Sequence, residues 1–167
     1  MLSFHVSLII SAVVLVSAIY DFKYRIIPNW LTYPTILIGI ILSLTPYSIS
    51  FIECMYGLAI CFIPSFLIYV FQGIGGGDVK LLTAIGVWVG SAAAIEVMIY
   101  TVIAGSGLSL IIIILNDQFW VTIKNSFKYL FFRKAIKQDL VITIKIPFAV
   151  PIAIGTLWAL ILPRHII

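Results

Sequence analysis

The sequence predicts an all-α fold, that of a polytopic membrane protein with six transmembrane helices. Its 167 residues are 63% hydrophobic and only 10% charged, and the mean hydropathy is +1.22. Soluble domains carry roughly a quarter charged residues, so this chain has too little polar surface to coat a soluble globule. The composition therefore excludes soluble enzymes and nucleic-acid-binding modules. The length accommodates about six spans of roughly 20 residues with short connections.

Long tracts without Asp, Glu, Lys or Arg place the helices. We expect them at residues 3–20, 30–46, 51–71, 79–90, 93–115 and 147–163. The first tract is expected to stay as a helix rather than to be a removable signal peptide, because basic residues follow it and none precedes it. The fourth is short, since residues 80–90 rise only ~17 Å as a helix, but one helix over 81–116 would rise about 54 Å. A hairpin that turns near Gly90 and Ser91 fits this tract better.

The basic residues predict how the helices are oriented in the membrane. With six spans, the first, third and fifth connections share one side, and nine of the ten basic residues fall there. These nine are Lys23, Arg25, Lys80, Lys124, Lys128, Arg133, Lys134, Lys137 and Lys145. An excess of Lys and Arg marks the cytoplasmic side, so both termini are expected to be extracytoplasmic.

One connection, residues 115–146, is much longer than the others and mixes aromatic with basic side chains. We interpret it as a basic amphipathic segment on the inner leaflet, with its rings in the interface and its cations at anionic lipid headgroups. A cytosolic loop that shields the helix ends explains it about as well, and substrate docking is a third explanation. Residues 1–167 are expected to form a single membrane-embedded domain.

Acidic side chains are costly in a membrane, so their positions are informative. Four of the six are interpreted as solvated: Glu53, Glu96, Asp117 and Asp139. Asp21 and Asp78 differ, because the topology places both at the cytoplasmic edge although 57 residues separate them. Two nearby carboxyls cannot both ionise cheaply and hold one shared proton. One can then take a proton from water while the other hydrogen-bonds a scissile carbonyl, which is the chemistry of peptide hydrolysis.

Asp78 closes a glycine-rich segment, Gly73-Ile74-Gly75-Gly76-Gly77-Asp78. Three consecutive glycines permit unusual backbone conformations and leave room for an extended peptide to approach the carboxylate. The simpler explanation is a tight turn, with the two aspartates acting as helix caps or as partners of Lys80 or Arg25. Phosphate binding is disfavoured, because the spacing matches neither nucleotide-binding fingerprint and a carboxylate would repel phosphate.

Other catalytic chemistries have less support. Ser106 lies between two glycines, as a nucleophilic serine on a tight turn does. Both histidines, His5 and His165, are expected near extracytoplasmic ends, so neither is expected to act as its general base. Cys54 and Cys61 are too few for a disulfide framework or a four-thiolate zinc site. They are interpreted as buried small hydrophobic residues on one face of a helix. No metal and no cofactor is expected.

Three segments carry a resemblance to a known family. Asp21 to Thr32, DFKYRIIPNWLT, and Gly75 to Gly90, GGGDVKLLTAIGVWVG, closely resemble the two aspartate motifs of the type IV prepilin peptidases, which are GxGD-type intramembrane aspartic proteases. Lys145 to Gly155, KIPFAVPIAIG, is similar to the last-helix pattern of that family. The resemblance spans nearly the whole chain, and both motifs occur in the expected order.

The resemblance implies a catalytic pair, Asp21 and Asp78. The supporting motif positions would be Pro28, Asn29, Gly75, Gly77 and Lys80. It further implies that the enzyme lies in the inner (plasma) membrane as a multi-pass protein. Its substrates would be type IV pilin-like precursors, cut on the cytoplasmic side after a short basic leader. Nucleic acid is not expected as a binding partner.

Larger relatives carry a cysteine-rich cytoplasmic insertion and also methylate the new amino terminus. That insertion and its CxxC pairs are absent here, so methylation is not expected. The chain resembles the short, peptidase-only branch of tight-adherence pilus systems or related secretion systems, and the related archaeal preflagellin peptidases stay open as an alternative. Two other hypotheses stay open from the residues: a small transporter whose aspartates bind a cation or relay protons, and a noncatalytic assembly factor.

Overall fold

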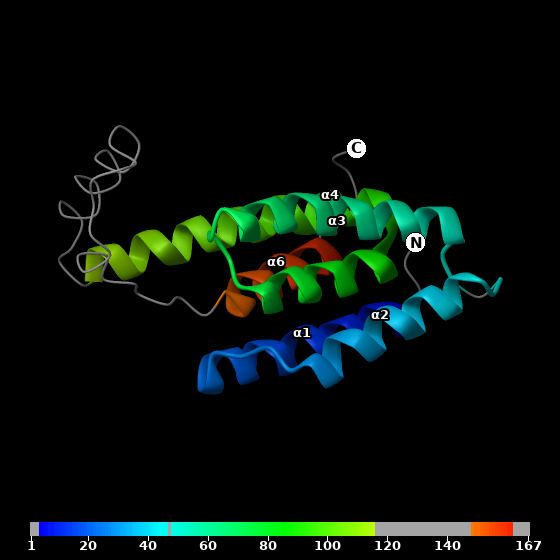
Figure 1. The fold of residues 1–167 in the computed structure, drawn as a ribbon, viewed down its shortest axis with the longest axis horizontal. Helices are drawn as coiled ribbons and strands as arrows, with labels where there is room; N and C mark the ends of the chain where they lie inside the picture. Colours follow the sequence, from blue (N-terminus) through cyan, green and yellow to red (C-terminus); the bar gives the residue numbers. More distant parts are fainter. Residues whose placement is uncertain (1–3, 47, 116–147, 162–167) are drawn as a thin grey trace. The chain divides into compact units, whose positions relative to one another are not determined.

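The computed structural model describes residues 4–46, 48–115 and 148–161. These ranges contain helices and no strand, which confirms the all-α prediction (Figure 1). The helices are α1 (Phe4–Tyr24), α2 (Asn29–Ser43), α3 (Phe51–Val70), α4 (Gly76–Leu115) and α6 (Ala149–Ile161). The predicted basic connection, residues 115–146, lies outside the described residues apart from its first position, as do Asp117, Asp139 and His165.

The chain divides into two compact units. The first comprises Met1–Gly105 and Pro147–Ile167, and the second comprises Ser106–Ile146. Of the second unit the structure describes only the last turns of α4, residues 106–115. The candidate site and its supporting contacts belong to the first unit.

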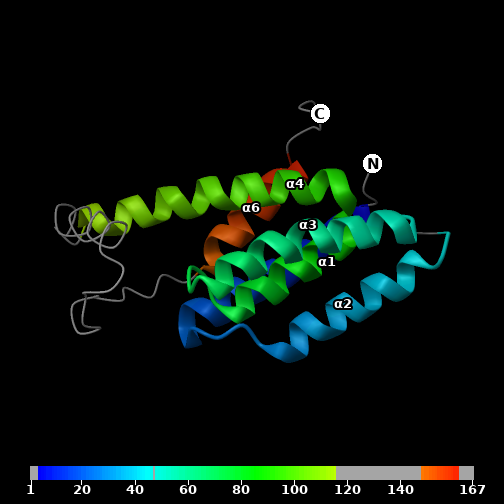
Figure 2. The same ribbon diagram turned by 45° about the horizontal axis from the view of Figure 1, so that its top comes forward.

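Helix α4 is interrupted at Gly90, where the sequence predicts a turn. Gly90 has φ 76° and ψ −179°, a left-handed conformation that glycine adopts without a steric penalty. Both views show the chain turning back at this point (Figures 1 and 2). The packing agrees: Asp78 shares a pocket with Asp21, whose carboxyl accepts the Ala149 N–H, and Phe148, the residue before Ala149, lies beside Gly105. The two halves of α4 therefore form a hairpin.

Glu53 stabilises the start of the second half of α4. Its Oε2 accepts hydrogen bonds from the Ser91 backbone N–H at 3.0 Å and from Ser91 Oγ at 2.6 Å. The first N–H groups of a helix have no acceptor within the helix, and a carboxylate there also interacts favourably with the helix dipole. The interpretation of Glu53 as a merely solvated carboxylate was thus incomplete, because this side chain caps the helix after the break.

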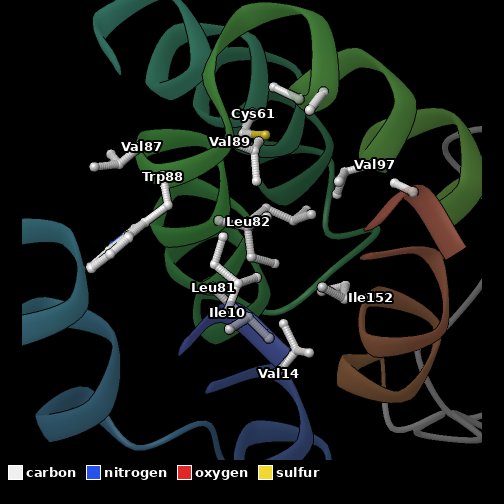
Figure 3. Close-up of a cluster of buried hydrophobic side chains, with 14 of the residues drawn as sticks. Ile10, Val14, Cys61, Leu81, Leu82, Val87, Trp88, Val89, Val97 and Ile152 are labelled. Carbon is white, nitrogen blue, oxygen red and sulfur yellow. The ribbon is translucent and has the colours of Figure 1, made fainter. Parts of the chain in front are cut away.

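The first half of α4 is the centre of the hydrophobic core. Its side chains Leu81, Val87 and Trp88 are buried together with Ile10 of α1 and Ile152 of α6 (Figure 3). This explains why a tract too short to span a membrane comfortably is nevertheless a stable helix. Other helices cover it, and its backbone hydrogen bonds are protected by protein.

Small residues allow α3 and α4 to approach closely. A Cβ added at Gly57 would collide with the carbonyl oxygen of Gly86, and one added at Gly86 would collide with that of Gly57. Cys54 and Cys61 on α3 are fully buried, as predicted from their spacing. Small residues at helix contacts are typical of membrane bundles, where the surrounding lipid is as apolar as the core.

The outward faces of the helices are apolar, with exposed Leu37 on α2 and Ile63 on α3 as examples. Among the described helices, three are long and apolar enough to cross a membrane: His5–Tyr24, Phe51–Val70 and Gly76–Ile111, the last containing the Gly90 break. Asn29–Ser43 and Ala149–Ile161 are shorter apolar helices. An apolar exterior on helices of this length indicates a membrane protein.

Candidate active site

The corner between α1 and α2 places Asp21. Helix α1 ends at Tyr24, and Arg25 adopts a left-handed conformation with φ 55° while its N–H donates to the Asp21 carbonyl at 2.8 Å. This is a common helix-ending motif. Pro28 then precedes α2 and holds the chain extended, with φ −71° and ψ 130°. Asp21 thus lies in the last turn of α1 rather than beyond it, because the helix runs four residues past the predicted end.

The corner between α3 and α4 has a similar construction and places Asp78. Gln72 is left-handed with φ 61°, and the Gly73 N–H donates to the Ile68 carbonyl at 2.9 Å. Helix α4 begins at Gly76, so Asp78 lies in its first turn. Each aspartate is therefore held by regular helix, on either side of a corner whose backbone geometry is defined by local hydrogen bonds.

The two corners enclose a polar pocket of about 350 Å³. Its lining residues are Asp21, Arg25, Ile26, Ile27, Asn29, Gly75, Gly76, Gly77, Asp78 and Lys80. The pocket brings together all the site residues expected from the sequence except Pro28, which begins the turn into α2 instead. Asp21 and Asp78, distant in the sequence, therefore lie at the same end of the helix bundle.

Both carboxyl groups are nearly buried, with Asp21 8% and Asp78 7% exposed. The Asp21 Oδ2 accepts the backbone N–H of Ala149 at 3.0 Å, and the Asp78 Oδ2 accepts that of Gly75 at 2.9 Å. The two carboxyls also interact electrostatically with each other. Each side chain thus has one oxygen fixed by a backbone donor, which orients the carboxyl plane within the pocket.

Lys80 connects the two corners. Its Nζ donates to the Asn29 Oδ1 at 3.0 Å and lies 4.9 Å from the centre of the Tyr33 ring. A hydrogen bond from an ammonium and a contact with an aromatic face each favour a defined position of the charge. Asn29 and Lys80, which the sequence resemblance singled out, therefore form a polar contact between α2 and α4 at the pocket wall.

The simpler explanation of Asp78 as a helix cap also describes part of the geometry. Its side chain reaches back to the N–H of the residue before α4, as the acidic residue of a capping box does. For Lys80, the partner is Asn29 rather than an aspartate. Capping and pocket lining are compatible, since a cap occupies only one carboxylate oxygen.

Sequence reasoning did not identify the contact between Asp21 and Ala149, 128 residues apart. The KIPFAVP segment indicated the start of a helix near this position, but nothing in the sequence indicated which side chain its free N–H groups would meet. Among the residues that the structure describes, no three His, Cys, Asp or Glu side chains cluster closely enough to hold a metal ion. The chemistry that the pocket offers is that of two close carboxyl groups: acid and base catalysis on a bound water.

Comparisons with known proteins agree with this geometry. A family model described as the type IV leader peptidase family matches residues 8–110, which include both aspartates. The chain is 38% identical over 80 residues to the prepilin leader peptidase/N-methyltransferase of Vibrio cholerae serotype O1. That alignment covers 43% of this chain and 31% of the relative, about a third of its length. No solved structure matches the chain. With more than half of its residues matched by the family model, the chain belongs to the type IV leader peptidase family.

Proposed function

We propose that the protein is an aspartic endopeptidase, embedded in the inner (plasma) membrane, that removes the leader peptide of type IV pilin-like precursors at the cytoplasmic face. The observation that carries the proposal is the pocket shared by Asp21 and Asp78, in which both carboxyls are nearly buried and oriented by backbone donors. Family membership supports the peptidase activity. Six spans with both termini extracytoplasmic would place this pocket at the inner membrane edge, where a basic leader is found.

The reaction follows from the pair. Two neighbouring carboxyls share one proton, so one is a base and the other an acid at the same pH. The base removes a proton from a water molecule, whose oxygen attacks the scissile carbonyl carbon while the acid donates a hydrogen bond to the carbonyl oxygen. The tetrahedral intermediate collapses when the C–N bond breaks and the leaving nitrogen takes the proton that the base removed from water. The products are a carboxylic acid and an amine, with the pair returned to its starting state.

Peptidase activity without methyl transfer is the narrower part of the proposal. The relative from Vibrio cholerae is described as both a leader peptidase and an N-methyltransferase, but the alignment covers 31% of it. The present sequence has two cysteines, and both are buried on α3. We therefore assign to the pocket the hydrolysis reaction alone.

The test is cleavage of a type IV pilin-like precursor by the purified full chain in detergent, in the presence of a chelator. Asp21→Asn and Asp78→Asn are each expected to reduce cleavage by at least about a thousandfold, because the residues act as a unit. Glu96→Gln is the matched control, since Glu96 lies on α4 outside the pocket. Wild-type cleavage by either aspartate variant would refute the pair. Cation flux into liposomes with an intact precursor would instead support a transporter.

A further inference from the structure

The N-terminus of α6 is in direct contact with the candidate catalytic pair. The Ala149 N–H donates to the Asp21 Oδ2 at 3.0 Å, and this hydrogen bond is buried. Ala149 itself is fully buried. Because a buried hydrogen bond to a charged group is short of competing water, its loss is costly for the group that it orients.

This N–H is available for Asp21 because of its place in the helix. Ala149 is the first residue of α6, and the Ile152 N–H donates to the carbonyl of Phe148, the residue before the helix, at 3.3 Å. The first N–H groups of a helix have no acceptor one turn earlier. They also carry the positive end of the helix dipole, which favours an anion. The position of Asp21 at this end of α6 therefore provides both a donor and a favourable potential.

Helix α6 is itself firmly placed. It packs along α1. On its other side, Gly155 lies against the Thr101 backbone of α4, so closely that a Cβ at Gly155 would collide with it. Tyr100 and Trp158 stack with their ring centres 5.9 Å apart and their planes at 10°. A helix held on two sides presents its first N–H in a defined direction, as a preorganised donor must be.

Asp78 has a donor of a different kind. Its Oδ2 accepts the N–H of Gly75, three residues earlier in the same corner, so its orientation depends on local structure alone. Asp21 depends instead on a helix that is remote in the sequence. The pair is thus fixed relative to α6 through Asp21.

We infer that Ala149 is a positioning residue of the peptidase, whose backbone N–H holds the Asp21 carboxyl in the direction required for catalysis. The inference rests on the proposed function of the pair. In this inference the start of α6 aligns the Asp21 carboxyl and does not itself contact the substrate. Removing the N–H should lower kcat and leave KM nearly unchanged.

Proline removes this N–H and is tolerated at the first position of a helix. In the full chain in detergent, Ala149→Pro is expected to lower kcat for precursor cleavage by about 10- to 100-fold, the effect of losing one hydrogen bond to a charged group. KM should stay within about twofold. Ala149→Val is the matched control, because it adds the same number of carbon atoms as proline and retains the N–H. Wild-type kcat in Ala149→Pro, or an equal loss in Ala149→Val, would overturn the inference.

A second measurement depends neither on activity nor on the proline variant. Hydrogen exchange at the Ala149 amide is compared between the wild-type chain and Asp21→Ala, with the Val150 amide as an internal reference. The hydrogen bond predicts that exchange at Ala149 accelerates by about tenfold or more in Asp21→Ala, while that at Val150 changes little. Unchanged exchange at Ala149 contradicts the inference. Accelerated exchange combined with full cleavage by Asp21→Asn contradicts the proposed function and leaves the structural contact established.

Discussion

The contact between Gly57 of α3 and Gly86 of α4 predicts a specific loss of stability on substitution by alanine. In each case the new Cβ would overlap a backbone carbonyl oxygen, which cannot rotate away as a side chain can. The helices must separate, and a gap of about 0.5–1 Å forfeits roughly a quarter to a half of the dispersion attraction across it. Overpacking costs about 1–3 kcal/mol, against a gain of up to about 1 kcal/mol from the better helix propensity of alanine. If the propensity gain is about 1 kcal/mol, the expected net loss is about 0–2 kcal/mol for each variant.

The control for these variants is Gly107→Ala, the same substitution within α4. No atom of the described residues lies within 4 Å of a Cβ built at Gly107. This variant is expected to be neutral or to gain up to about 1 kcal/mol. The free energy of unfolding is measured in mixed micelles with increasing denaturing detergent, by tryptophan fluorescence.

The double variant tests the mechanism of this loss. Once α3 and α4 have separated for Gly57→Ala, the room needed by Gly86→Ala is already present. The double variant should therefore lose less than the sum of the two single variants, with a coupling of about 1 kcal/mol or more. Strict additivity, or single variants as stable as Gly107→Ala, would refute the explanation from backbone contact.

Two further predictions concern the core and the pocket. Trp88→Phe removes the hydrogen bond of 2.8 Å from the buried indole N–H to the Thr35 carbonyl of α2. We expect the free energy of unfolding to fall by about 1 kcal/mol from the loss of this bond alone, measured by the same unfolding assay. An unchanged unfolding midpoint would contradict this prediction. In Gly75→Ala, the new methyl group would lie 3.1 Å from the Asp78 Oδ2. The carboxyl must then shift by a few tenths of an ångström, which weakens its hydrogen bond with the Gly75 N–H. Precursor cleavage should therefore fall by up to about tenfold at an unchanged unfolding midpoint. Wild-type cleavage would show that the orientation of Asp78 is not needed.

Much of the architecture was readable in the sequence, because a membrane protein must satisfy its backbone within helices. The predicted ranges match the described helices closely, and the break near Gly90 was expected from length alone. The burial of Cys54 and Cys61 followed from their seven-residue spacing. The count of six spans and the orientation of the termini stay predictions. The aspartates were singled out by the cost of acids in an apolar chain and by their motifs.

Tertiary structure alone decided what surrounds those acids. Local patterns describe which residues share a helix face, but they do not specify which remote backbone donor reaches a given carboxylate. The contact between Ala149 and Asp21 depends on how α6 packs against α1, and the bond from Lys80 to Asn29 depends on how α2 meets α4. Glu53 likewise becomes a cap only because α3 begins beside the break in α4. Such contacts arise from the close packing of whole helices, a property of the assembled chain and not of any segment within it.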